Sequence, residues 1–233
     1  MNNVKTYIPN TITCCNLLCG CLAIVLAFQE PRLLGVLDTG QWAWILIGAA
    51  SVFDFCDGLS ARLLKAYSPM GKELDSLSDL VSFGLAPAFL VMQSMIHGGA
   101  SPWLALCALV IALGGALRLA KFNVDTRQTT SFVGLPIPAN AIFWIGVLGW
   151  MRVHGYPGDV VMVILEVALA LLMVSEIKMF SLKFSSLGLR GNLRRYTVLA
   201  AAVLFVLTDG VAGLAWTIVL YILISAFGRK EAV

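Results

Sequence analysis

Long apolar stretches, separated by short polar segments, follow one another along almost the whole chain. A helix needs about 20 predominantly apolar residues to cross the hydrocarbon core of a bilayer, and most of these stretches approach that length. We predict eight such helices, over residues 11–29, 41–65, 72–97, 102–122, 137–154, 158–177, 195–208 and 211–227. The pattern therefore predicts an all-α fold, a polytopic bundle of about eight transmembrane helices, of which the last two are short.

The composition agrees with this pattern, because 59% of the residues are hydrophobic and only 12% are charged. A soluble domain has about a quarter of its residues charged. No soluble domain, low-complexity tract or short repeat interrupts the pattern, so we expect residues 1–233 to form a single membrane-embedded domain. Most of the six cysteines lie within the apolar stretches, and we interpret them as small reduced side chains.

Lysine and arginine are unevenly distributed between the predicted helices. If the N-terminus lies inside, the inner segments carry fourteen of them, and the outer segments carry only Arg32 and Arg152. Basic residues accumulate on the cytoplasmic side of membrane proteins. We therefore expect an integral protein of a bacterial or archaeal cell membrane, with both termini in the cytoplasm and with no nucleic acid partner.

Four aspartates stand out in this apolar chain, at positions 54, 57, 75 and 79. Ionisable residues within membrane segments are costly and usually functional. Residues three or four apart share a helix face, so Asp54 and Asp57 share one face, and Asp75 and Asp79 share a face of the next helix. Such an all-oxygen pocket suits hard divalent cations, Mg²⁺ or Mn²⁺. The spacing predicts metal-assisted chemistry on phosphate at the cytoplasmic ends of the two helices.

Small residues and one arginine accompany the aspartates. Gly58, Ala61 and Gly71 allow a flat group to approach the backbone closely, and Arg62 offers a charged donor fork for a phosphate oxygen. The alternative, that the carboxylates are ordinary interfacial charges, accounts for one or two of them. It does not account for four in helical register with small residues between them.

The whole run resembles the signature of the CDP-alcohol phosphotransferases, with all eight fixed positions present: Asp54-x2-Asp57-Gly58-x2-Ala61-Arg62-x8-Gly71-x3-Asp75-x3-Asp79. The resemblance implies two divalent cations held by the four aspartates. It also implies a CDP-lipid whose pyrophosphate bridges the cations, Asp79 as the general base, and a homodimer. Gly58, Ala61, Arg62 and Gly71 are then expected to contact the CDP-lipid.

The segment Pro9-Asn10-Thr11-Ile12-Thr13-Cys14-Cys15-Asn16 resembles the P-N-x2-T-x2-N element of the same family. This implies that Asn10 and Thr13 contact the nucleotide. Without the resemblance, an Asn/Thr pair before a predicted helix is more often an N-cap.

Two further segments resemble the serine-using branch of the family. They are Phe132-Val133-Gly134-Leu135-Pro136-Ile137-Pro138-Ala139 and Arg118-Leu119-Ala120-Lys121-Phe122-Asn123, in which Lys121 replaces an arginine of the branch. The resemblance implies CDP-diacylglycerol and L-serine as substrates, and CMP as a product. We expect Arg118 and Asn123 to bind serine. The alternative for the first segment is a proline-stiffened turn that opens the fifth helix.

Two other functions remain open. An enzyme of the same family could use glycerol 3-phosphate or an inositol phosphate as acceptor, which would favour a denser basic cluster. A divalent-cation transporter would instead need polar residues along a complete path through the bilayer. The aspartates here gather at one end of their helices while the other halves are apolar, which argues against transport.

Overall fold

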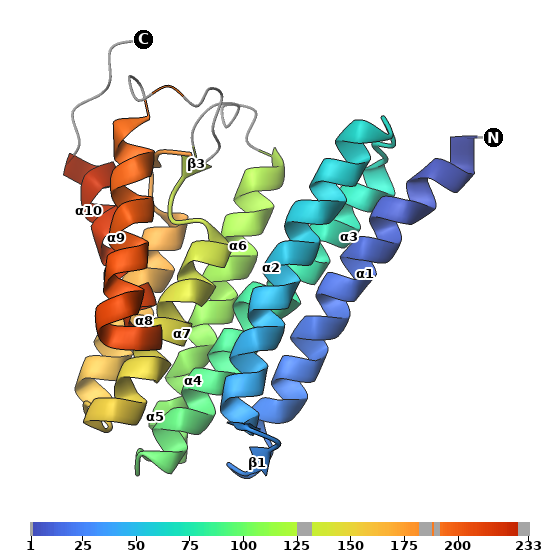
Figure 1. Ribbon diagram of the computed structural model, residues 1–233. Coiled ribbons are helices and arrows are strands. Elements are labelled where there is room, and N and C mark those ends of the chain that lie inside the picture. The colour runs from blue at the N-terminus through green and yellow to red at the C-terminus, as the bar shows by residue number, and fades with distance from the viewer. Residues whose placement is uncertain (1, 125–131, 182–187, 189–191, 228–233) are drawn as a thin grey trace.

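The computed structural model describes residues 2–124, 132–181, 188 and 192–227, and over these residues the protein is a bundle of helices that run up and down (Figure 1). The helical elements are α1 (Asn2–Ala27), α2 (Thr39–Leu63), α3 (Pro69–Asp79), the π-helix η1 (Leu80–Leu85), α4 (Ala86–His97), α5 (Pro102–Ala105), the 3₁₀ turn η2 (Leu106–Ala108), α6 (Leu109–Val124), α7 (Ile137–His154), α8 (Asp159–Val174), α9 (Leu193–Asp209), the 3₁₀ turn η3 (Gly210–Ala212) and α10 (Gly213–Phe227). α1 begins and α10 ends at the same end of the bundle (Figure 1).

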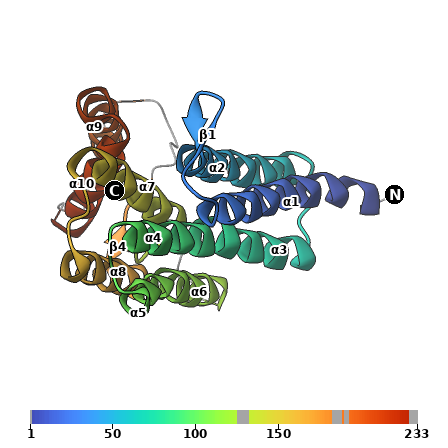
Figure 2. The ribbon, with the colours of Figure 1, turned by 90° about the horizontal axis from the view of Figure 1, so that it is seen from below.

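Two short antiparallel strand pairings complete the fold. β1 (Leu33–Leu34) pairs with β2 (Leu37–Asp38) between α1 and α2, and β3 (Phe132–Val133) pairs with β4 (Lys178–Met179). The view along the bundle shows α1, α2 and α3 on one side, α9 and α10 on the other, and α4 between them (Figure 2). The α3–α4 rod packs against α1, α6 and α7, so it occupies the centre.

Five stretches of the described chain are long and apolar enough to cross a membrane: Lys5–Ala27, Thr39–Leu63, Pro69–His97, Pro102–Val124 and Leu193–Phe227. The last one contains two helices, because Gly210 has φ +59° and separates α9 from α10. α7 and α8 are helical where predicted but are not among the five. The structure thus confirms a helical bundle with membrane-length helices, and the number eight stays a prediction.

The start of the first helix differs from the prediction. α1 begins at Asn2 rather than at residue 11 and contains Pro9, although proline removes a helical hydrogen bond. Pro9 is buried where α1 meets its neighbours, and tertiary packing of this kind outweighs local propensity. Asn10 and Thr13 therefore lie inside the helix, and their interpretation as N-caps is wrong.

The centre of the bundle is a single rod made of α3, η1 and α4. Ser68 caps its start by accepting a hydrogen bond from the Gly71 amide at 2.9 Å. At the π-helix, the Ser82 hydroxyl donates to the Asn16 carbonyl of α1 at 2.9 Å. A Cβ atom at Gly20 would lie 2.4 Å from Ser82 Oγ. The two helices therefore meet in a close contact that a larger residue at position 20 would prevent.

The segment before α7 forms a tight turn attached to the end of α8. Gly134 has φ +77°, and a Cβ atom there would lie 2.1 Å from the Met173 carbonyl oxygen. Pro136 caps α7, which begins at Ile137 as predicted. Ile137 is fully buried, and its Cδ1 atom packs against Gly84 of the π-helix and Gly115 of α6. The expected proline-stiffened turn is thus present, and it also supports the central rod.

Candidate active site

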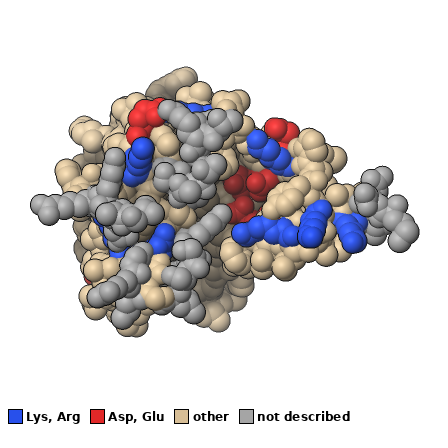
Figure 3. Space-filling model, turned by 90° about the horizontal axis from the view of Figure 1, so that it is seen from above, with Lys and Arg blue, Asp and Glu red and all other residues tan. Residues whose placement is uncertain are grey.

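Three of the four aspartates converge near the N-terminal end of the bundle. Carboxylate oxygens of Asp54 and Asp57 on α2 and of Asp75 on α3 all lie within 4.8 Å of one another. Helical spacing brings the first two together on α2, and the packing of α2 and α3 on α1 brings Asp75 to them. Acidic side chains gather in a hollow at this end, with Lys and Arg side chains beside it (Figure 3).

Asp79 lies one turn further along α3 and is 8% exposed. Its Oδ1 atom accepts a hydrogen bond of 3.2 Å from Asn16 Nδ2, and Asn16 is completely buried on α1. Asp79 is outside the group of three that lies within 4.8 Å. The structure therefore places it beside this group, with a neutral amide fixing its direction.

Three carboxylates of this site lack a salt bridge within the described residues, although the buried Arg118 interacts electrostatically with Asp79. Among the described residues, Asp57, Asp75 and Asp79 form no ion pair with Lys or Arg, and Asp75 Oδ1 is buried without a hydrogen-bond partner. Carboxylates this close repel one another when ionised. Hard oxygen ligands, mutual repulsion and an unsatisfied buried oxygen together fit a site for divalent cations.

A cavity of about 200 Å³ opens next to the aspartates, between α1, α2 and α3. Five residues predicted to contact a CDP-lipid line it, together with Asp57 and Asp75: Asn10, Thr13, Gly58, Ala61 and Gly71. The Thr13 hydroxyl lies 2.6 Å from Asp57 Oδ2 and donates to it. The N-terminal element and the aspartate run, separate in sequence, therefore form one site.

The glycines of this cavity act in two ways. A Cβ atom at Gly58 would meet no protein atom within 4 Å, because this face of α2 opens into the cavity. A Cβ atom at Gly71 would lie 3.1 Å from Asn10 Oδ1, so Gly71 allows α3 to approach α1. Gly58 thus leaves space for a ligand, and Gly71 closes the wall around it.

Arg62 does not line this cavity. Its Nε atom donates to the Gly58 carbonyl of the same helix at 2.9 Å, and the side chain is exposed. Arg62 therefore bonds to its own helix, and its contact with a CDP-lipid stays a prediction.

The two residues predicted to bind serine occupy different positions. Arg118 on α6 is 7% exposed, lies 5.1 Å from the centre of the Phe122 ring, and interacts electrostatically with Asp79. Asn123, at the end of α6, donates from Nδ2 to Ser76 Oγ at 2.9 Å, and its carbonyl accepts from Lys72 Nζ at 3.0 Å. Arg118 therefore faces the site, whereas Asn123 links α6 to α3.

Three residues of the site were missed by the sequence analysis. Asn16 holds Asp79, and Tyr67 and Lys72 line the cavity beside the nucleotide-contact candidates. Asn16 is the last position of the P-N-x2-T-x2-N element, so a signal was present for it. Tyr67 and Lys72 lie at positions that the signature leaves open, and only folding brings them to the cavity.

Comparison with known proteins gives consistent results. The sequence model of the CDP-alcohol phosphatidyltransferase family matches residues 6–174. A CDP-diacylglycerol–serine O-phosphatidyltransferase of Bacillus subtilis (strain 168) is 40% identical over 133 residues, which cover 57% of this chain and 70% of that protein. Proteins of the same name are 35% identical over 171 residues in Methanocaldococcus jannaschii (73% of this chain and 72% of that protein) and 32% identical over 175 residues in Helicobacter pylori strain 26695 (73% and 70%).

Proposed function

We propose that this chain, which belongs to the CDP-alcohol phosphatidyltransferase family, transfers the phosphatidyl group of CDP-diacylglycerol to the hydroxyl of L-serine and releases CMP. The main support for this proposal is the cluster of Asp54, Asp57 and Asp75, which lies beside a cavity lined by both sequence elements of the family. The activity named for the similar bacterial and archaeal proteins gives the choice of serine.

The four aspartates would hold two divalent cations, Mg²⁺ or Mn²⁺. When bound, two such ions neutralise a pyrophosphate, stabilise the leaving oxygen of CMP and orient an in-line displacement. The buried, unpaired Asp75 Oδ1 supports this role, because an unsatisfied buried carboxylate oxygen is costly without a ligand.

The cavity between α1, α2 and α3 would bind the CDP moiety. Asn10 and Thr13 offer polar groups from α1, while Gly58, Ala61 and Gly71 keep the wall low enough for a flat nucleotide. Arg62 follows the cavity residue Ala61 in sequence, and its exposed side chain would donate to a phosphate oxygen of the bound lipid.

Asp79 would act as the general base. The serine hydroxyl oxygen attacks the phosphorus that carries diacylglycerol, its proton passes to Asp79, and the bond from this phosphorus to the CMP oxygen breaks. Asn16 supports this role, because its amide donates to Oδ1 and leaves Oδ2 of Asp79 available to the incoming hydroxyl.

Arg118 and Asn123 would bind the serine zwitterion. The buried guanidinium of Arg118 suits a carboxylate that lies near Asp79. The amide nitrogen of Asn123 bonds to Ser76, and its amide oxygen would accept from the ammonium group of serine.

The membrane arrangement follows the same proposal. We infer about eight spanning helices within one domain of 233 residues, a homodimer, and an active site that faces the cytoplasm with both termini. The five membrane-length stretches and the excess of basic residues at the aspartate end support this arrangement.

An acceptor screen tests the activity. Purified protein with CDP-diacylglycerol and Mg²⁺ or Mn²⁺ should release CMP with L-serine and far less with glycerol 3-phosphate or inositol phosphate. If the protein prefers either of these phosphate acceptors, it is a member of the family with an acceptor other than serine. Reconstituted vesicles that take up metal ions without releasing CMP would instead support a transporter.

A further inference from the structure

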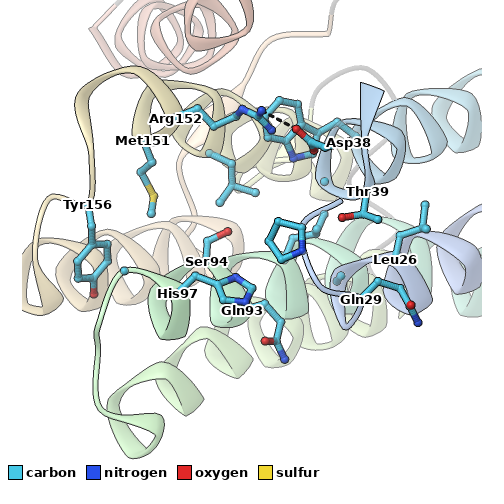
Figure 4. Close-up of a pocket in the computed structure, with 17 residues that line it drawn as sticks. Leu26, Gln29, Asp38, Thr39, Gln93, Ser94, His97, Met151, Arg152 and Tyr156 are labelled. Atoms are coloured by element: carbon cyan, nitrogen blue, oxygen red, sulfur yellow. Dashed lines mark ion pairs between the residues drawn. The ribbon is translucent and has the colours of Figure 1, made fainter. Parts of the chain in front are cut away.

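A second cavity, of about 450 Å³, lies at the end of the bundle opposite the aspartates (Figure 4). It is enclosed by the ends of α1, α4 and α7 and the start of α2; we refer to it as the distal cavity. His97 lines it at the end of α4, 22 residues after Asp75 on the same rod. At 1.5 Å per residue this is a separation of about 30 Å, so the distal cavity is not part of the active site.

Polar side chains of α4 line one wall of the distal cavity. Gln93 and Ser94 precede His97 by four and three residues, so the three share a helix face. None of these side chains has a hydrogen bond within the described part of the chain. Ser94 and His97 are directed into the space between α4 and α7 (Figure 4). Three hydrogen-bonding groups on an otherwise apolar helix therefore remain available to a ligand.

The opposite wall carries an arginine whose guanidinium has N–H groups beyond those in its ion pair. Arg152 on α7 pairs with Asp38 at 2.5 Å and lies 5.5 Å from the Trp44 ring centre. This pair engages one guanidinium nitrogen, whereas a guanidinium has five N–H donors. Asp38 uses its other oxygen to accept from the Gln41 amide. Its carboxylate is thus occupied while Arg152 can still donate, so the cavity favours an anionic oxygen ligand.

The remaining wall is hydrocarbon, with Leu26, Leu90, Leu148 and Met151 beside the polar groups. A free inorganic anion would leave these side chains unused. We propose that the distal cavity binds the head group of a phospholipid, with the phosphodiester at Arg152, Ser94 and His97 and the glycerol end of the chains against the apolar wall. This lipid is separate from the lipid substrate, and the proposal does not depend on the reaction catalysed.

The test uses the full-length protein in lipid-depleted detergent, with phosphatidylglycerol as the probe and thermal unfolding as the readout. The lipid should raise the midpoint of the wild type. His97→Leu and Ser94→Leu should each weaken its apparent affinity about tenfold, because each removes a hydrogen bond to a charged group. Both variants leave the Asp38–Arg152 pair intact.

The chain provides matched controls at the same end of the bundle. His154→Leu changes the other histidine, which stacks on Trp150 outside the cavity, and Arg32→Gln changes another arginine; both should bind as wild type does. Equal stabilisation of wild type and cavity variants would overturn the proposal. If diacylglycerol raises the unfolding midpoint as much as the phospholipid does, the cavity does not recognise the phosphodiester. If inorganic phosphate does so, the ligand is not a lipid.

Discussion

The carboxylates at the two ends of the bundle have different surroundings. At the distal end, Asp38 is paired with Arg152 and also caps α2 through the Gln41 amide. At the other end, Asp57 and Asp75 lie together without an ion pair to any described Lys or Arg. Arg152 pairs with the first carboxylate, whereas the other two lie close enough to repel each other when ionised, as in the proposed site for divalent cations.

Two lysines at the aspartate end bind partners outside the aspartate cluster. Lys121 pairs with Glu176, and Lys72 donates to the Asn123 carbonyl. These contacts hold α6 to its neighbours. Local charge counts therefore do not distinguish a structural carboxylate from a metal ligand, but the geometry of the pairing does.

The largest effect should come from neutralising an aspartate of the cluster. Asp75→Asn should lower turnover by about two orders of magnitude or more. Without divalent metal, the same variant should unfold at a higher temperature than the wild type, because repulsion with its neighbours is relieved. Addition of Mn²⁺ should stabilise the wild type most. Activity and unfolding curves, with and without chelator, test this together.

Glu73→Gln is the matched control, since this exposed carboxylate stands two residues before Asp75 on α3. It should retain activity and metal stabilisation. Asp54→Asn, Asp57→Asn and Asp79→Asn should lose turnover as Asp75→Asn does. Near-wild-type turnover of a folded Asp75→Asn variant would contradict the proposed metal site.

Arg118 tests whether a protein cation compensates the cluster after all. Arg118→Lys should raise the serine KM about tenfold, because a point charge cannot bind a carboxylate with two parallel hydrogen bonds. The KM for CDP-diacylglycerol should change little. Separate titrations of the two substrates measure this. Equal effects on both, with a lower unfolding temperature, would instead make Arg118 a structural partner of the carboxylates.

A neutral residue should give a smaller effect in the same region. Asn16→Ala should lower kcat about tenfold, since the lost hydrogen bond is to a charged group, while the KM of CDP-diacylglycerol stays nearly constant. Cys19→Ala, a buried change three residues along α1, is the control for packing. If both variants lose activity alike, Asn16 only supports the helix contact.

The smallest effect should appear at the distal end. Asp38→Ala should lower the free energy of unfolding by about 1–2 kcal/mol, through loss of the cap and of a partly exposed ion pair. The hydrogen bond from Arg152 lowers the pKa of Asp38. The pair therefore stabilises the protein above the unfolded-state value of about 3.9, and this contribution disappears as the pH falls through the lower folded-state pKa.

Unfolding curves of wild type and Asp38→Ala at several pH values measure this difference. The two proteins should converge under acid conditions, where Asp38 is protonated in both states of the wild type. A constant difference across the whole range would mean that the carboxylate charge contributes nothing.

The sequence predicted those parts of the molecule that depend on local pattern. Apolar length located the helices, and α7 begins and ends at the predicted residues 137 and 154. Helical spacing placed Asp54 and Asp57 together on one face of α2. These inferences succeeded because each rests on neighbours within one or two helical turns.

What the sequence did not predict depends on contacts between helices. The apolar pattern did not indicate the extension of α1 to Asn2, and the contact of Asn16 with Asp79 joins α1 to α3. Asn123 was predicted to bind serine, but its hydrogen bond to Ser76 of α3 could not be predicted from spacing within α6. Side-chain partners across helices are set by packing, which no single segment encodes.

The π-helix Leu80–Leu85 fixes the angular phase between the two ends of the molecule. Its wider turn contains an additional residue relative to an α-helix, and each residue of an α-helix corresponds to about 100° of rotation. Removing one residue here would rotate α3 by roughly that angle against α4, which is held by its own packing. Asp75 and Asp79 would then leave the side that faces α1 and α2. The number of residues in this one turn therefore sets the direction in which Asp75 and Asp79 face.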